Sequence, residues 1–399
     1  MIHTPNQMNS LTMSVLPSLK TKRISENQII LTQKFIDGML EYQNYWHDKI
    51  NVFIEEDNTI NDNLDNTIVD INQLPFKIKI VDFNKIQENR EFQDSSIVLA
   101  TIGYRQNNIA QICKTHQISC IYVTEYSLKT RLQIINSANF NIIALVKKYI
   151  GQLVQEKKQE KSIAQADGVQ CNGTPTYETY KNINPNPLLY FDTRVTSDML
   201  ISEDELVNRT SQCLANKPLR LLFSGRLVAI KGADHLILVA QELIKLQVKF
   251  EMFICGDGDL RESMQKQINQ NQLSDFVKML GVLEFKNELI PFVKKNVDLF
   301  ICCHRQGDPS CTYLETLSCG VPIVGYDNEA FVGIVKYSQT GWSIRINKPE
   351  LIARKISELD KNRQIIVDHS SRSLEFARLH TFEKTFSKRI NHIKEIIAK

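Results

Sequence analysis

Short apolar runs and amphipathic stretches alternate along both halves of the chain. Residues 96–100 (SIVLA) and 119–124 (SCIYVT) are apolar and β-rich, and residues 107–116 between them have a helical pattern. Strands that alternate with helices in this way predict an α/β fold with parallel sheets. Further strands are expected at 168–172, 219–223, 250–255, 277–280, 298–303 and 321–324, and further helices at 141–166, 232–246, 260–269, 288–295 and 312–319.

The length of the chain and one break in the pattern predict two domains. The chain has 399 residues, more than one hydrophobic core usually serves. Pro185 and Pro187 interrupt regular structure, and residues 192–217 are mixed and polar, so we place the connection there. We expect an N-terminal domain over residues 1–195 and a C-terminal domain over residues 196–381.

Two polar segments in the first half of the chain need their own interpretation. Residues 51–66 are rich in Asn and Asp, and we expect loop or edge structure there. The helix expected at 141–166 carries the run KKYIGQLVQEKKQEKS. Such a run is most often a solvated helix face, and a contact with a membrane surface or a partner is the alternative, so weak peripheral membrane association stays open.

Composition and charge narrow the class of protein. The chain is 42% hydrophobic and 23% charged with a net charge of +3. These values are typical of globular proteins and exclude wholesale disorder. A nearly neutral chain is not a general polyanion binder, so we expect no nucleic-acid partner. Since no run of about eighteen apolar residues and no signal-peptide pattern are present, we expect a cytoplasmic protein. The nine cysteines form no CxxC pair and no zinc-ligand spacing, so we expect free thiols and no metal site.

The most informative segment is the loop SGRLVAIKG at residues 224–232. It follows an expected strand and opens an expected helix. Arg226 and Lys231 lie five residues apart in it, beside backbone amides at a helix N-terminus, and this combination favours a diphosphate. A surface loop with incidental charges is the alternative for this segment taken alone.

A second segment, residues 304–325 (HRQGDPSCTYLETLSCGVPIVG), places a small-residue turn and a short helix between two strands. Amides near Ser310 to Tyr313 would point toward the strand ends, where open α/β sheets bind ligands. Glu315 lies one turn into the helix, where a carboxylate can accept two hydrogen bonds from a ribose diol. An exposed helix acid near the favourable dipole end is the alternative.

Taken together, these motifs resemble the donor-binding half of the family-four retaining glycosyltransferases of GT-B fold, the glycosyl transferases group 1. The resemblance rests on Arg226 and Lys231 in GRLVAIKG, on Gly256-Asp257-Gly258 after a strand, and on Glu315 in LETLSCGVPIV. It covers roughly residues 219–345. It implies two Rossmann-like parallel-sheet domains that face a cleft, with a last helix, residues 382–399, that returns to the N-terminal domain.

The resemblance also implies roles for individual residues. Arg226 and Lys231 would neutralise the diphosphate and stabilise the leaving group. Gly225 and the Gly256-Asp257-Gly258 loop would border the nucleotide, and the backbone at Gly281 would lie by the base. Glu315 would hold the ribose hydroxyls. The backbone amides at the start of the short helix would meet the distal phosphate; these belong to Ser310, Cys311, Thr312 and Tyr313.

The sequence departs from the family pattern at three places. The acid usual eight residues before Glu315 is replaced by Gly307, and Asp308 is the neighbour that can serve instead. The paired glycines after the next strand are replaced by residues 327–330 (DNEA), and the N-terminal glycine loop by residues 17–23 (PSLKTKR). Since Gly307 has no side chain, we expect Asp308 or a backbone amide to contact the donor sugar.

The N-terminal domain offers an acid where many relatives carry a histidine that faces the sugar. Glu125 ends the strand IYVTE and can bind a sugar hydroxyl, orient the acceptor or relay its proton; a solvated strand-end glutamate is an equal alternative. Tyr104 and Arg105 are further candidates for the cleft.

Two classes of function remain. The first is a retaining transferase that moves a sugar from a nucleoside-diphosphate sugar to an acceptor hydroxyl of a glycan, a lipid-linked glycan or a small molecule, without metal or other cofactor. The second is a catalytically silent relative that binds a sugar nucleotide or a partner as a scaffold. The joint presence of Arg226, Lys231 and Glu315 favours the transferase, while Gly307 motivates the alternative.

Overall fold

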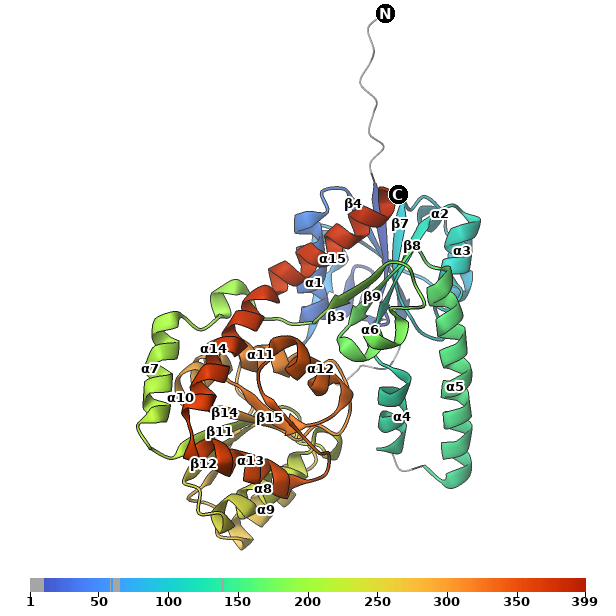
Figure 1. The fold of residues 1–399 in the computed structure, drawn as a ribbon. Coiled ribbons are helices and arrows are strands. Elements are labelled where there is room, and N and C mark those ends of the chain that lie inside the picture. Colours follow the sequence, from blue (N-terminus) through green and yellow to red (C-terminus); the bar gives the residue numbers. More distant parts are fainter. Residues whose placement is uncertain (1–10, 58, 60–64, 138–139) are drawn as a thin grey trace, which may run out of the picture.

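The computed structural model describes residues 11–57, 59, 65–137 and 140–399. Residues 1–10 of the expected N-terminal domain, and 58 and 60–64 of the Asn/Asp-rich segment, lie outside the described residues. The chain forms two sheets, and Figure 1 shows them in two lobes joined through the middle of the chain and by its C-terminal helices. Among the described residues, no helix is long and apolar enough to cross a membrane.

The N-terminal sheet has the strand order β10-β9-β8-β7-β1-β4-β2-β3-β5, with β6 paired to β4. Its pairs are parallel except β2 with β3 and β3 with β5. The strands are β1 Thr12–Leu16, β2 Lys20–Arg23, β3 Gln28–Thr32, β4 Lys49–Glu56, β5 Asn66–Asp70, β6 Lys77–Ile80, β7 Ile97–Thr101, β8 Ser119–Thr124, β9 Gly168–Asn172 and β10 Pro187–Tyr190. The helices are α1 Gln33–Tyr45, α2 Arg90–Gln93, α3 Ile109–Thr115, α4 Leu128–Asn136, α5 Ile142–Gln165 and α6 Thr174–Tyr180, with short 3-10 turns at 71–73 and 83–88.

The C-terminal sheet is parallel throughout, in the order β13-β12-β11-β14-β15-β16. Its strands are β11 Leu219–Ser224, β12 Phe250–Cys255, β13 Val277–Gly281, β14 Leu299–Cys302, β15 Ile323–Tyr326 and β16 Trp342–Ile344. Its helices are α7 Glu203–Leu214, α8 Ala233–Lys245, α9 Arg261–Gln270, α10 Ile290–Asn296, α11 Thr312–Ser318, α12 Glu329–Ser338, α13 Pro349–Lys361, α14 Gln364–Leu379 and α15 Phe382–Ile397, with short turns at 197–199, 229–231 and 285–289. The α/β class with two parallel Rossmann-like sheets, expected from the sequence, is confirmed.

The expectation of loop or edge structure at 51–66 is wrong for its first part. Residues 51–56 belong to β4, which lies between β1 and β2 and is buried except at its ends. Ile50, Val52, Phe53 and Ile54 supply a buried strand, and the Asn/Asp-rich composition describes only the segment after it. The edge strand is β5, which begins at Asn66.

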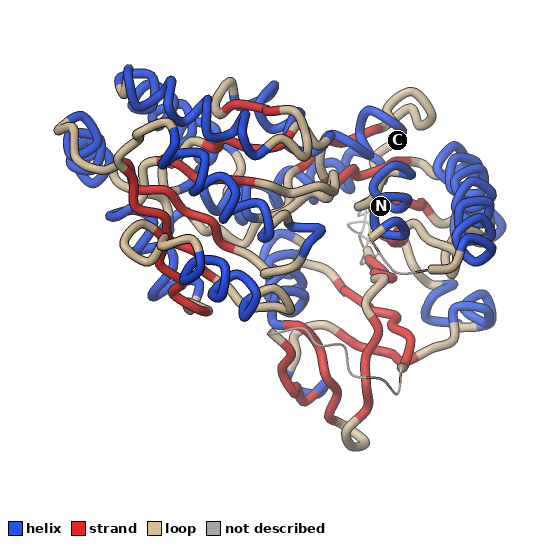
Figure 2. Tube along the Cα trace, turned by 90° about the horizontal axis from the view of Figure 1, so that it is seen from below, coloured by secondary structure: helices blue, strands red, loops and turns tan. Residues whose placement is uncertain are grey.

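The chain passes between the lobes twice. After β10, Phe191 already packs in the C-terminal core, and α7 caps its own N-terminus through Ser202 and Glu205. At the far end, the Phe382 amide donates to the Val195 carbonyl at 2.8 Å. Helix α15 then contributes Phe386, Ile390, Ile393 and Ile396 to the apolar core of the N-terminal sheet and α1. Figure 1 shows the two crossings side by side, and Figure 2 shows the two lobes from below.

Candidate active site between the two sheets

The loop after β11 brings two cations to the cleft. Arg226 is exposed there, while Lys231 is buried. Gly232, with φ 69°, starts α8, and a Cβ on it would lie 2.0 Å from the Cys303 carbonyl oxygen. Only glycine allows this approach, because the left-handed conformation and the adjoining backbone both exclude a side chain. The loop after β11 therefore packs directly on the end of β14, and Lys231 points between the two strands' loops.

Lys231 meets Asp308 at this point. The Lys231 Nζ lies 2.7 Å from the Asp308 Oδ2, and both side chains are largely buried. Burial raises the pKa of Asp308, but the charge and hydrogen bond of Lys231, together with His304 and Gln306, outweigh burial and keep that pKa below its ordinary value. Asp308 is therefore a carboxylate with one oxygen held by Lys231.

The position that lacks the expected acid is closed by another carboxylate. A Cβ on Gly307 would lie 2.3 Å from the Glu329 Cγ. The Glu329 carboxylate in turn accepts hydrogen bonds from the Ser127 hydroxyl and, at 2.9 Å, from the Thr130 hydroxyl of the N-terminal lobe. The Gly307 amide donates to the Gln133 side chain at 3.0 Å. Glu329 of α12, held by residues at the start of α4, thus fills the place where a side chain at 307 would lie.

His304 also lies in this wall, and the sequence did not single it out. The imidazole is 1% exposed, and neither ring nitrogen has a hydrogen-bond partner among the described residues. Burial, and then the charge of Lys231, lower the pKa of His304 to about 3. A neutral imidazole therefore lies beside the cleft with both nitrogens free.

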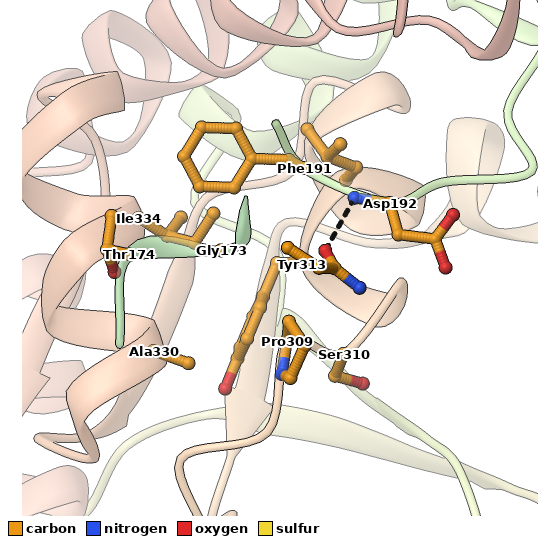
Figure 3. Close-up of a pocket in the computed structure, with 11 residues that line it drawn as sticks. Gly173, Thr174, Phe191, Asp192, Pro309, Ser310, Tyr313, Ala330 and Ile334 are labelled. Atoms are coloured by element: carbon orange, nitrogen blue, oxygen red, sulfur yellow. Dashed lines mark hydrogen bonds between the residues drawn. The ribbon is translucent and has the colours of Figure 1, made fainter. Parts of the chain in front are cut away.

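The start of α11 forms the floor of the cleft, and its residues divide into two groups. Ser310, Cys311 and Thr312 line the cleft, whereas the Tyr313 side chain points away and stacks on Phe331 with ring centroids 5.5 Å apart. Figure 3 shows Tyr313 behind the loop that carries Pro309 and Ser310, with Gly173 and Asp192 of the N-terminal lobe opposite. The dashed bond in that view joins the Asp192 amide to the Asn172 side chain at 3.1 Å.

Glu315 lies outside this cavity lining and is paired. Its Oε1 lies 2.7 Å from the Arg194 Nε, and the Arg194 guanidinium lies 3.8 Å from the centre of the Phe285 ring. Arg194 is itself exposed. The carboxylate that the sequence assigns to a ribose is thus held by an exposed arginine.

The glycine loops border the site through their backbones. The Gly256 amide donates to the Gly281 carbonyl at 2.7 Å, and a Cβ on Gly256 would lie 1.9 Å from the Gly225 carbonyl oxygen. The Asp257 carbonyl accepts from the Leu227 amide at 2.8 Å. The loops after β11, β12 and β13 therefore form one hydrogen-bonded edge next to Arg226, although Gly256, Asp257, Gly258 and Gly281 do not line the cavity itself.

The opposite wall comes from the N-terminal lobe. Glu125 and Tyr126 follow β8 and line the same cavity, of about 450 Å³, as Gly225, Arg226, Lys231 and Asp308. The Glu125 side chain reaches solvent, yet desolvation by the cleft walls, and then the Asp192 carboxylate, raise its pKa. A carboxyl group with this raised pKa faces the cation pair across the cleft.

Lys34, Asp192 and Cys311 form a cluster that sequence reasoning missed. Lys34 donates to the Asp192 carboxylate and lies 3.3 Å from the Cys311 sulfur. The three residues come from α1, from the crossing after β10 and from the loop before α11, so no local spacing could have revealed them. Tyr104 and Arg105, by contrast, line a different cavity with Lys20 and Arg23, where Arg105 is bound by Glu55 and Asp82.

The C-terminal lobe is similar to known glycosyltransferases. Residues 206–374 match the model of the glycosyl transferases group 1. An uncharacterised glycosyltransferase of Methanocaldococcus jannaschii is 26% identical over 190 residues, 47% of each chain. The 2-deoxystreptamine N-acetyl-D-glucosaminyltransferase of Niallia circulans is 27% identical over 120 residues, 30% of each chain. The chain thus matches less than half the length of these curated relatives.

Two solved structures cover nearly the whole chain. Anabaena Alr3699/HepE in complex with UDP superposes with a TM-score of 0.67 and 12% identity, covering 96% of this chain and 99% of that one. The lipopolysaccharide outer core galactosyltransferase WaaB superposes with a TM-score of 0.63 and 13% identity, with the same coverage. Both lobes thus have the GT-B fold, and residues 206–374 match the family model of the glycosyl transferases group 1.

Proposed function

We propose that the protein is a glycosyltransferase that moves a sugar from a nucleoside-diphosphate sugar to an acceptor hydroxyl, with retention of configuration. One observation carries the proposal: Arg226 and Lys231 line the same cavity as Glu125, at the carboxyl ends of two facing parallel sheets. Ligands of open α/β sheets bind at such edges.

In this proposal the chain's residues stabilise the leaving group and position the reactants. Arg226 and Lys231 neutralise the diphosphate as the bond to the sugar breaks, without a metal ion. The acceptor attacks from the face that the diphosphate leaves, and a diphosphate oxygen takes the acceptor proton, so that no strong protein base is needed. Asp308 holds Lys231 and offers its second oxygen to the sugar, and Glu125 orients the acceptor across the cleft.

The donor is proposed to be a UDP-sugar. The support is that solved structures of the same fold hold UDP, and one is a complex with UDP-glucose. The names of the relatives include a 2-deoxystreptamine transferase and, in Acholeplasma laidlawii, an alpha-monoglucosyldiacylglycerol synthase, 23% identical over 185 residues.

The test is release of nucleoside diphosphate from a panel of sugar nucleotides, with and without hydroxyl acceptors and with EDTA in parallel. We expect release from a UDP-sugar that acceptor accelerates, that EDTA leaves unchanged, and that Arg226→Ala abolishes. NMR of the product should show the donor's anomeric configuration. Binding of a sugar nucleotide without release in the presence of any acceptor would instead support a silent scaffold.

A further inference from the structure

Helix α5 presents an apolar stripe to solvent at the edge of the molecule. Figure 1 shows α4 and α5 as a hairpin in which α5 is outermost. Its first turns carry large aliphatic side chains that are each between 51% and 78% exposed. At about 100° per residue they fall within about 120° of the helix surface. They are Ile142, Ile143, Val146, Ile150, Leu153 and Val154.

More than half of the surface of each side chain in this apolar stripe is left uncovered by the described residues. The opposite side of α5 buries Glu156, Gln159, Ser162 and Ile163. Phe140, just before the helix, is also 40% exposed and lies 4.4 Å from the Lys148 Nζ. An exposed contiguous apolar surface of this kind marks an interaction site.

The charged residues that precede the apolar stripe and lie within it are all basic. Residues 128–155 contain Lys129, Arg131, Lys147 and Lys148 and no Asp or Glu. The next acid, Glu156, is buried and paired with Arg131, and Glu160 pairs with Lys157. Toward its C-terminal half, the exposed side of α5 continues with further lysines at 157, 158 and 161.

We propose that the α4–α5 hairpin docks on the surface of an anionic bilayer. The apolar stripe would insert among the lipids, while the flanking lysines contact anionic headgroups; this is the pattern of an interfacial amphipathic helix. A second copy of the chain fits less well, because a symmetric contact through the apolar stripe would bring Lys147 and Lys148 of both copies together without an acid to pair them.

The hairpin also borders the cleft. Helix α4 is preceded by Ser127 and carries Thr130 and Gln133, which bind Glu329 and the Gly307 amide. A docked bilayer would therefore lie one helix away from the cleft wall. Docking does not depend on the proposed transfer reaction, so each stands or fails by its own experiment.

The experiment is co-sedimentation of the full chain with vesicles of phosphatidylcholine, with or without phosphatidylglycerol. We expect binding to the anionic vesicles that high salt weakens. Ile143→Glu/Ile150→Glu should lose at least about tenfold in affinity. Lys147→Gln/Lys148→Gln should lose the preference for phosphatidylglycerol. The matched control is Val207→Glu/Leu379→Glu, which changes equally exposed apolar residues of α7 and α14 and should bind as wild type.

Circular dichroism and thermal unfolding establish that each variant is folded. Absence of vesicle binding by wild type, or equal binding by Ile143→Glu/Ile150→Glu, would overturn the proposal. So would light scattering that shows a wild-type dimer which this double variant converts to monomer, because the apolar stripe would then be an interface between copies.

Discussion

Lys231 and Asp308 form an ion pair across the cleft wall, with 2.7 Å between the Nζ and the Oδ2. The two residues come from neighbouring loops, after β11 and after β14, and the Asp308 Oδ1 has no hydrogen-bond partner among the described residues. Asp308 thus fixes the direction of the lysine, while its second oxygen is buried and unpaired among the described residues. The pair thus joins Lys231, which is proposed to bind the diphosphate, to Asp308, the acid next to Gly307.

The pair predicts how the two single variants differ from the double variant. Lys231→Ala leaves a largely buried carboxylate unpaired and should lower the free energy of unfolding by about 3 kcal/mol. Lys231→Ala/Asp308→Ala should recover much of that loss while remaining inactive. Urea unfolding and turnover measure both, with Lys245→Ala on the exposed face of α8 as the control. A double variant no more stable than Lys231→Ala would contradict the coupling.

Asp308 and Glu315 should affect different parts of the donor. Asp308→Ala should lower turnover more than it weakens binding of the bare nucleoside diphosphate, because only the sugar of the donor loses a contact. Glu315→Ala should weaken binding of the nucleotide itself by about 1.5–3 kcal/mol, since the proposed contact of Glu315 is the ribose. Calorimetry with UDP and steady-state rates separate the two.

Arg194 supplies the control for the Glu315 prediction. Arg194 holds the Glu315 carboxylate, and a ribose bound there would have to compete with it, so Arg194→Ala should leave UDP affinity equal or higher. If Asp308→Ala and Glu315→Ala weaken UDP binding equally, the assignment of Asp308 to the sugar and Glu315 to the ribose is wrong.

The close approach of Glu329 to Gly307 predicts that a change at Glu329 can restore stability to a variant at Gly307. Gly307→Glu alone should destabilise the protein, because its Cβ would lie 2.3 Å from the Glu329 Cγ, which Ser127 and Thr130 hold in place. Glu329→Ala removes that obstacle, so Gly307→Glu/Glu329→Ala should unfold at a higher temperature than Gly307→Glu. Thermal unfolding of the three variants checks this, and equal midpoints for both Gly307 variants would show that Glu329 does not restrict the position.

His304 predicts a dependence of stability on pH. Its pKa is about 3 in the folded protein against an ordinary 6.5, so above pH 6.5 it is neutral in both states. As the pH falls below 6.5, the unfolded chain takes up a proton that the folded protein does not, and stability decreases by up to about 1.4 kcal/mol per pH unit. His304→Gln should flatten the fall between pH 6 and pH 4 in urea unfolding; an unchanged slope would show that His304 is not kept neutral.

Local patterns predicted much of the scaffold and little of the cleft's far wall. The strands and helices around Arg226, Lys231 and Glu315 follow the sequence closely, because each is a short strand or an amphipathic helix with a clear turn between them. Strand β4 was misread because a polar segment after it dominated the composition. The Lys34–Asp192–Cys311 cluster and the Gln133 contact with Gly307 join segments far apart in the chain, and such pairs leave no periodic signal.

The central claim is that Arg226 and Lys231 hold a nucleoside diphosphate. The most direct measurement is thermal unfolding of wild type, Arg226→Ala and Lys231→Ala with UDP, GDP, ADP, TDP or CMP. At a hundredfold its dissociation constant, a bound diphosphate should stabilise wild type by about 2.7 kcal/mol. UDP should stabilise wild type against thermal unfolding, and CMP, with a single phosphate, should do so far less. Neither variant should be stabilised by UDP. If no diphosphate stabilises wild type, or if UDP stabilises both variants as much as wild type, the assignment of Arg226 and Lys231 to a diphosphate is contradicted.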